Sequence, residues 1–284
     1  MSAPFAVGFA ALLAAGAAAA PAAPAGLVSQ PVKATIQTIM SPSAAAWAGA
    51  PKFEVRTMPQ LIAQPNQPKP SVDKLMVRSL YSVESGWIAF HLEWRDATKD
   101  ETPRPGQWAD VVAIEFPLDA KSPPAPMMGH RPGGRVQIIQ WRADWQKDVD
   151  KGETTVKDLY PNAVVDTPVE KVYQYADSQA FSAGRAIGNI VSQAKHFYSV
   201  QDLMAEGFGT LTPKPVQNAL GKGVWEKGTW KVVIARPMET LTDPAAAPLH
   251  RGAPAEVGFA VWNGSAGERG ARKGWAGWVP LAIK

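Results

Sequence analysis

The sequence predicts a mainly β protein, a two-sheet antiparallel β-sandwich with a few short helices. Short runs rich in β-branched and aromatic residues recur along the chain, and Gly, Pro or Asp separates nearly every pair of runs. Many short strands of this kind are typical of a sandwich or a barrel. Because the sequence has no internal repeat and no clear linker, we expect residues 26–284 to form a single domain.

Residues 1–25 precede this domain and have the pattern of a secretory signal peptide. The run is apolar, and it reaches an A-x-A-like cleavage site at Ala23, Pro24 and Ala25. No Lys or Arg precedes Lys33, so the basic start of a typical signal is missing, and a disordered Ala/Pro-rich tail is the alternative. The signal predicts a periplasmic protein. No other segment approaches the roughly 20 apolar residues of a membrane span.

The expected strands begin with an edge strand around residues 53–58 and a hairpin formed by residues 74–82 and 86–96. Apolar residues alternate with Ala89, His91 and Glu93 in the second hairpin strand, which predicts one buried and one solvated face. Further strands are expected at residues 110–118, 135–143, 170–176, 229–238, 255–264 and 277–283.

Two segments between these strands have other patterns. Residues 179–193 are compatible with a short helix, although Gly184 and Gly188 weaken it. Residues 211–223 resemble a long surface connection. We therefore expect little helix.

The composition excludes several classes of protein. The chain has no cysteine, which excludes disulfides, thiolate zinc sites, protein-ligated iron-sulfur clusters and c-type haem attachment. The formal net charge of +4 comes from scattered residues and not from the dense basic run of a nucleic-acid or lipid surface. The four histidines lack metal-ligand spacing, and no nucleophile, phosphate-loop or dinucleotide motif occurs. The sequence therefore indicates no catalytic centre of its own.

Two methionines lie in an unusual setting, the loop PPAPMMGHRPGG at residues 123–134. Methionine is usually core filler, but the flanking prolines and glycines predict a stiff turn-forming loop with no core to fill. Such a loop can hold a thioether at fixed geometry against a flat cofactor, and haem iron accepts this soft ligand. A second unusual residue, Lys273, lies in a Gly-rich turn before two tryptophans. By spacing alone, Lys273 is an ordinary surface lysine.

Six blocks of sequence resemble the haem b-binding gamma subunits of the ethylbenzene dehydrogenase and dimethylsulfide dehydrogenase family. The similarity extends from about Trp47 onward. In order, the blocks are WADVVAIEFP (108–117), PMMGH (126–130), IIQWRADWQ (138–146), DLMAEGFGTLT (202–212), GVWEKGTWKVVIARPM (223–238) and VWNGSAGERGARKGWAGWVPL (261–281).

The resemblance implies a β-sandwich that holds one non-covalent b-type haem with a methionine and a lysine as axial ligands. Carried onto this sequence, the methionine before Gly129 is Met128 and the lysine after ERGAR is Lys273. Met127 is an alternative because the register of the loop is uncertain, and His130 is another because imidazole is a common haem ligand. A lysine can bind iron only as the neutral amine, which requires burial and the charge of the metal.

The surroundings of a haem are expected to include cations for the propionates and flat apolar walls. The alternative role for an arginine is a salt bridge at the rim of the sandwich, and the alternative role for a tryptophan is packing in the sandwich core. Expected propionate partners are Arg142, Arg185 and Arg272, and expected walls are Trp141, Trp275 and Trp278.

The resemblance further implies an electron-transfer subunit that is not an enzyme by itself. Its partners would be a molybdopterin-containing alpha subunit and an iron-sulfur beta subunit, with a soluble carrier such as a c-type cytochrome as external redox partner. A cytochrome without a molybdenum partner is a second possibility. A secreted carbohydrate-binding module is a third, because the 11 tryptophans could stack on sugar rings. Met128 and Lys273 separate the haem and sugar hypotheses, since a sugar site needs neither.

Overall fold

The secondary structure is mainly β in the computed structural model, which describes residues 26–62, 65–102, 104–162, 183–193 and 195–284. The strands are β1 (Leu27–Val32), β2 (Phe53–Arg56), β3 (Met58–Pro59), β4 (Lys74–Ser82), β5 (Trp87–Arg95), β6 (Val111–Pro117), β7 (Val136–Arg142), β8 (Val200–Ala205), β9 (Thr212–Pro213), β10 (Leu220–Trp225), β11 (Thr229–Pro237), β12 (Pro254–Trp262) and β13 (Gly274–Ile283). The helical segments are α1 (Ile36–Ile39), η1 (Ala45–Gly49), α2 (Ala143–Lys151), α3 (Val156–Leu159), α5 (Ala183–Ala186) and η3 (Ile190–Ser192). The expected signal peptide and the expected strand at 170–176 lie outside the described residues.

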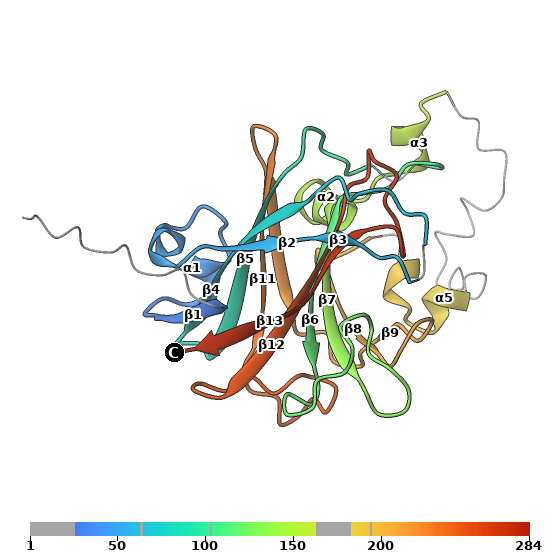
Figure 1. The fold of residues 1–284 in the computed structure, drawn as a ribbon. Coiled ribbons are helices and arrows are strands. Elements are labelled where there is room, and N and C mark those ends of the chain that lie inside the picture. The colour runs from blue at the N-terminus through green and yellow to red at the C-terminus, as the bar shows by residue number, and fades with distance from the viewer. Residues whose placement is uncertain (1–25, 63–64, 103, 163–182, 194) are drawn as a thin grey trace, which may run out of the picture.

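The strands form one curled sheet in the order β10-β11-β5-β4-β1-β13-β12-β6-β7-β8-β9. Its two halves are joined through β1, which runs parallel to both β4 and β13, whereas the other pairs are antiparallel. In Figure 1, β4, β5 and β11 make one half and β6, β7 and β8 the other. The expected mainly β class is confirmed, and hydrogen bonds link the two halves into one sheet.

The main core lies between the facing halves of this sheet. Phe90 on β5 and Phe116 on β6 have ring centroids 5.6 Å apart, and Trp141 on β7 lies 5.0 Å from Trp230 on β11. All four side chains are at most 1% exposed. Aromatic side chains from opposite halves of the sheet therefore pack together in this core.

The outer face of β5 is buried at Ala89 and His91 and partly exposed at Glu93, so the expected solvated face is wrong over most of its length. Residues of α1 and η1 cover it, and Ala89 packs in the same cluster as Trp47. His91 is 2% exposed, with Nε2 3.0 Å from the carbonyl oxygen of Pro42. Burial lowers the pKa of His91 to about 4, which favours a neutral ring. The apolar segment before η1 supplies this cover, which a pattern within β5 alone does not reveal.

The expected surface connection at 211–223 is also wrong in part. Its end belongs to β10, which pairs with β11 in an antiparallel hairpin from Leu220↔Ala235 to Trp225↔Trp230. The short helix expected within 179–193 is found as α5 and the following 3-10 turn η3. Among the described residues, no helix has the length and apolar character needed to cross a membrane.

Candidate functional site

A cavity of about 500 Å³ lies on the face of the β12-β6-β7-β8 half-sheet that is turned away from the main core. Antiparallel pairing sets directly opposed residues on one face. One such row is Val111, Arg142 and Trp262, and the next contains Ala113, Gln140 and Ala260. All six line the cavity. The alternation of the strands therefore builds its floor, and residues of the neighbouring loops line the rest.

Met127 and Met128 line this cavity from the loop before β7. Met128 has a φ of 64°, a left-handed conformation that costs a non-glycine residue energy and must be stabilised by its surroundings. Its backbone N–H donates to Glu115 Oε1 at 2.8 Å, and its carbonyl oxygen accepts from the N–H of Gly207. The backbone of Met128 is thus held at both ends.

His130 follows Met128 but does not line the cavity. Its side chain is exposed, and its backbone pairs with Gly134 in a small isolated bridge. A Cβ at Gly134 would lie 2.8 Å from the His130 ring, so the ring packs over this glycine. The geometry of the loop therefore favours the methionines over His130 as groups that face a ligand.

Lys273 lines the same cavity from the turn before β13. Its Nζ lies 4.9 Å from the centroid of the Trp262 ring. Trp262 Nε1 donates to the carbonyl oxygen of Gly270 at 2.9 Å, which ties the turn to the half-sheet. Burial lowers the pKa of Lys273, and the charge of Glu115 acts in the opposite direction.

Glu115 is the carboxyl group that faces both segments. It lies on the cavity face of β6, where burial raises its pKa to about 7 although the N–H of Met128 and the charge of Lys273 lower it. Sequence reasoning missed this residue. A single charged side chain within the apolar run VVAIEFP was the available signal.

Arginines occupy different places relative to the cavity. Arg142 lines it, and its Nε and Nη2 donate to the carboxylate of Asp144 at 3.0 and 2.7 Å. Arg272 is not among the lining residues, although its buried Nε has no hydrogen-bond partner in the described part of the chain. The side chain of Arg185 lies outside the described residues. Arg269, which sequence reasoning missed, is an exposed lining residue whose guanidinium lies 4.0 Å from the centroid of the Trp108 ring.

Of the three expected wall tryptophans, only Trp275 lines the cavity. Its Nε1 donates to the carbonyl oxygen of Pro59 at 3.2 Å. Trp278 donates to the carbonyl oxygen of Pro124 and does not reach the cavity. Trp108 and Trp262 supply aromatic walls that sequence reasoning did not single out.

Trp141 lies on the core face of β7, opposite to the cavity. It is 0% exposed and packs on β10, where a Cβ at Gly223 would lie 2.1 Å from its Cζ2. The expected role of Trp141 as a cavity wall is therefore corrected. Trp141 pairs with Val112, so both point into the core, whereas their neighbours Arg142 and Val111 point into the cavity.

The fit of Trp141 against Gly223 predicts a large effect for a small substitution. We expect Gly223→Ala to lower the free energy of unfolding by about 1–3 kcal/mol, because an added methyl group overpacks the core. Chemical denaturation measures this change. Gly49→Ala is the control, since a Cβ at Gly49 meets no atom within 4 Å. Equal stability of the two variants would contradict the account.

A sequence model described as "Ethylbenzene dehydrogenase" matches residues 44–274. The chain is 26% identical over 234 residues to the chlorate reductase subunit gamma of Ideonella dechloratans, covering 81% of this chain and 73% of that protein. It is 25% identical over 238 residues to a protein named as a respiratory nitrate reductase heme subunit in Haloferax mediterranei, covering 84% of this chain and 66% of that protein. A family 9 carbohydrate-binding module from Caldicellulosiruptor kristjanssonii, solved with glucose, aligns at a TM-score of 0.42 and 9% identity over 91% of this chain and 95% of that chain.

Proposed function

Because the chain belongs to the ethylbenzene dehydrogenase family, we propose that its cavity holds one b-type haem between Met128 and Lys273 and that the protein is an electron-transfer subunit. The observation that carries this proposal is that these two residues, 145 positions apart in the sequence (273 − 128), line one cavity. A bound haem would supply a one-electron centre that cycles between ferric and ferrous iron.

The chemistry of the lining residues fits a haem. A volume of about 500 Å³ lies within the range of small-molecule and cofactor sites, and the floor and covering loops are largely apolar. Gln60 also lines the cavity, is 2% exposed, and has an Oε1 with no hydrogen-bond partner among the described residues. Arg142 and Arg269 are cationic lining residues suited to propionates. The site thus offers the thioethers of Met127 and Met128, the amine of Lys273, flat walls and charge partners.

Lys273 must supply a neutral amine to act as a ligand. Burial, which lowers its pKa, favours that form before any metal is present. The thioether of Met128 needs no deprotonation. A Met ligand raises the potential of a haem, which suits a centre that accepts electrons from iron-sulfur clusters. If Met128 and Lys273 both bound the iron, no position would remain open for a substrate, so this chain would relay electrons without catalysing the substrate reaction.

The relatives support a place within a larger oxidoreductase. One is named as a gamma subunit of chlorate reductase and the other as a heme subunit of nitrate reductase. We infer that this chain assembles in the periplasm with a molybdopterin-containing alpha subunit and an iron-sulfur beta subunit. A soluble carrier such as a c-type cytochrome would be the external partner.

A carbohydrate-binding role is less well supported. A sugar platform needs accessible aromatic rings. All 11 tryptophans lie within the described residues, and each is buried or half-buried. Several belong to the core between the sheet halves, which explains their number without a sugar ligand.

The test is reconstitution of the purified protein with haem. We expect one haem per chain, a b-type pyridine haemochrome and a low-spin ferric spectrum. Met128→Ala should convert the ferric form largely to high spin, while Met127→Ala, its matched control in the same loop, should remain low-spin. A protein that folds but binds no haem would overturn the proposal, and the opposite result for the two variants would assign Met127 as the ligand.

A further inference from the structure

The strongest remaining feature of the site is the carboxyl group of Glu115, which contacts the segment of one expected ligand and faces the other. Within β6, Val111 and Ala113 on the same face are apolar, so a carboxyl group at this depth is costly and needs partners. It accepts a hydrogen bond from the backbone N–H of Met128, at 2.8 Å. A Cβ at Gly258, directly across the strand pair, would lie 3.4 Å from Glu115 Oε2.

The loop that carries Met128 has few other means of holding this residue in place. The left-handed φ of 64° is unfavourable for methionine and persists only where surrounding contacts enforce it. Glu115 holds the N–H of Met128, and Gly207 donates to its carbonyl oxygen. Gly129, the next residue, admits no side chain because a Cβ there would lie 1.9 Å from the carbonyl oxygen of Gly134. Within the described part of the chain, the thioether itself makes no hydrogen bond.

We propose that Glu115 is a positioning residue that fixes the backbone of Met128 so that its thioether is presented to the cavity. This inference rests on the proposed haem site. Because the carboxyl group acts through the backbone N–H, the thioether remains free to bind iron. Lys273 lines the same cavity, and its charge also acts on this carboxyl group.

The test compares Glu115→Gln with Glu115→Leu. Gln keeps an oxygen acceptor at the same reach and loses the charge, whereas Leu removes the acceptor. In the haem-free protein, we expect the Met128 amide to exchange with deuterium about tenfold faster in Glu115→Leu, as for loss of one hydrogen bond, and near the wild-type rate in Glu115→Gln. In the reconstituted ferrous protein, carbon monoxide should displace the Met ligand faster in Glu115→Leu alone.

The two proposals fail in different ways. If the wild-type protein binds no haem, the haem site is wrong, while amide exchange still reports on the contact with Glu115. If the wild type binds haem and Glu115→Leu matches it in exchange and in carbon monoxide binding, the positioning role is overturned. Equal damage in Glu115→Gln and Glu115→Leu also overturns it, because charge and not the hydrogen bond would then matter. Should Glu115→Leu fail to fold, Glu115→Asp, which retracts the carboxyl group by one methylene, must reproduce the faster exchange.

Discussion

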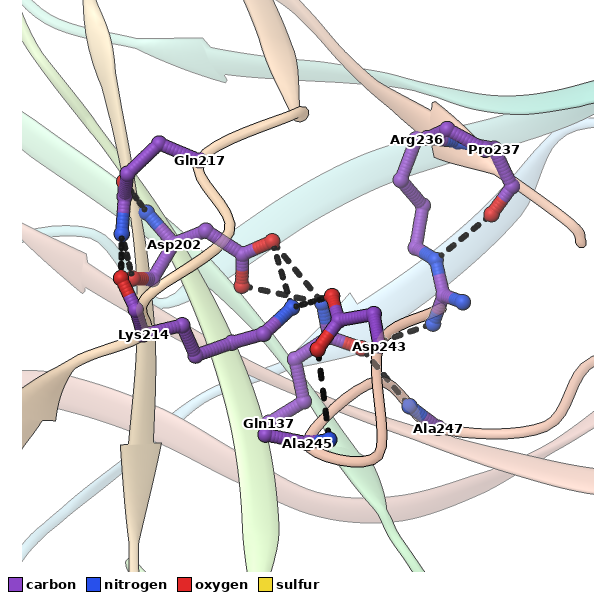
Figure 2. A network of polar contacts seen from close by, with 9 residues as sticks. All are labelled: Gln137, Asp202, Lys214, Gln217, Arg236, Pro237, Asp243, Ala245 and Ala247. Carbon is purple, nitrogen blue, oxygen red and sulfur yellow. Dashed lines mark hydrogen bonds and ion pairs between the residues drawn. The ribbon is translucent and has the colours of Figure 1, made fainter. Parts of the chain in front are cut away.

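Replacing Lys214 with methionine is expected to lower the free energy of unfolding by about 3–5 kcal/mol, because it leaves buried carboxylates without their cation. Lys214 is 0% exposed and pairs with Asp202 at 2.9 Å and Asp243 at 2.7 Å. Figure 2 shows its ammonium group between the two carboxylates. Urea denaturation of the wild type and the variant measures the change.

The surrounding network amplifies this effect. Gln137 Nε2 donates to both oxygens of Asp202, and Gln137 Oε1 accepts from Arg236 Nη1 and from the N–H of Ala247 (Figure 2). The network therefore joins β7, β8 and β11 to the segment before β12. Since each member orients the next, removal of Lys214 disturbs contacts beyond its own two ion pairs.

Lys222→Met is the matched control for Lys214→Met. Lys222 also forms a Lys–Asp pair, 2.8 Å from Asp150, but both side chains are about 40% exposed. Exposed pairs contribute about 0–1 kcal/mol because water and salt screen them. Equal losses of stability in the two variants would show that burial of the Lys214 network has no energetic consequence.

The stability deficit of Lys214→Met should also depend on pH. Burial raises the pKa of Asp202, and the charge of Lys214 is the largest of the influences that lower it. Without Lys214, the folded protein should bind protons at its buried carboxyl groups at a pH where the unfolded chain does not. A group whose pKa is higher in the folded state than in the unfolded state contributes to the free energy of unfolding at low pH. This contribution disappears as the pH rises through the folded pKa. The deficit is therefore expected to shrink on acidification.

Most strands were predictable because each is a local pattern bounded by turn residues. The range 74–82 agrees with β4. The ranges expected for β5, β6 and β7 extend one residue further at each end, and the range expected for β11 extends one residue further at its C-terminal end. β10 was missed because Gly221 and Gly223 have low strand propensity. Their function is steric, since a Cβ at either residue would collide with a neighbouring side chain. This requirement arises from a strand distant in sequence and leaves no periodic signal.

The methionine loop was predictable from its flanking prolines and glycines, but its pairing with Lys273 was predictable only through the family resemblance, which the match over residues 44–274 confirms. Met128 and Lys273 were named in this way, and both line the cavity. The faces of Trp141 and Arg142 depend on the register of β7 against β6, which the one sequence does not determine. Glu115 and Arg269 become significant only when β6 and the turn before β13 are brought to one cavity, so sequence reasoning did not identify them.

Lys273→Ala is expected to have the largest effect on the proposed haem site, because it removes an axial ligand while leaving the cavity walls. We expect a high-spin ferric spectrum and at least about a hundredfold weaker haem binding, if loss of one ligand costs some 3 kcal/mol. Lys69→Ala is the control, since the side chain of Lys69 is 80% exposed and pairs with the exposed Asp73. Haem titration followed by absorbance measures both quantities.

The space left by the Lys273→Ala substitution gives a further check on the role of the amine. A small primary amine such as ethylamine should enter this space and restore the low-spin spectrum, because it returns the missing nitrogen donor without the tether. Rescue should be stronger at higher pH, where more of the added amine is neutral and able to bind iron. In the wild type, acidification should release Lys273 from iron, since protons compete with the metal for the amine. A low-spin Lys273→Ala protein that needs no added amine would show that another residue, such as His130, supplies the ligand.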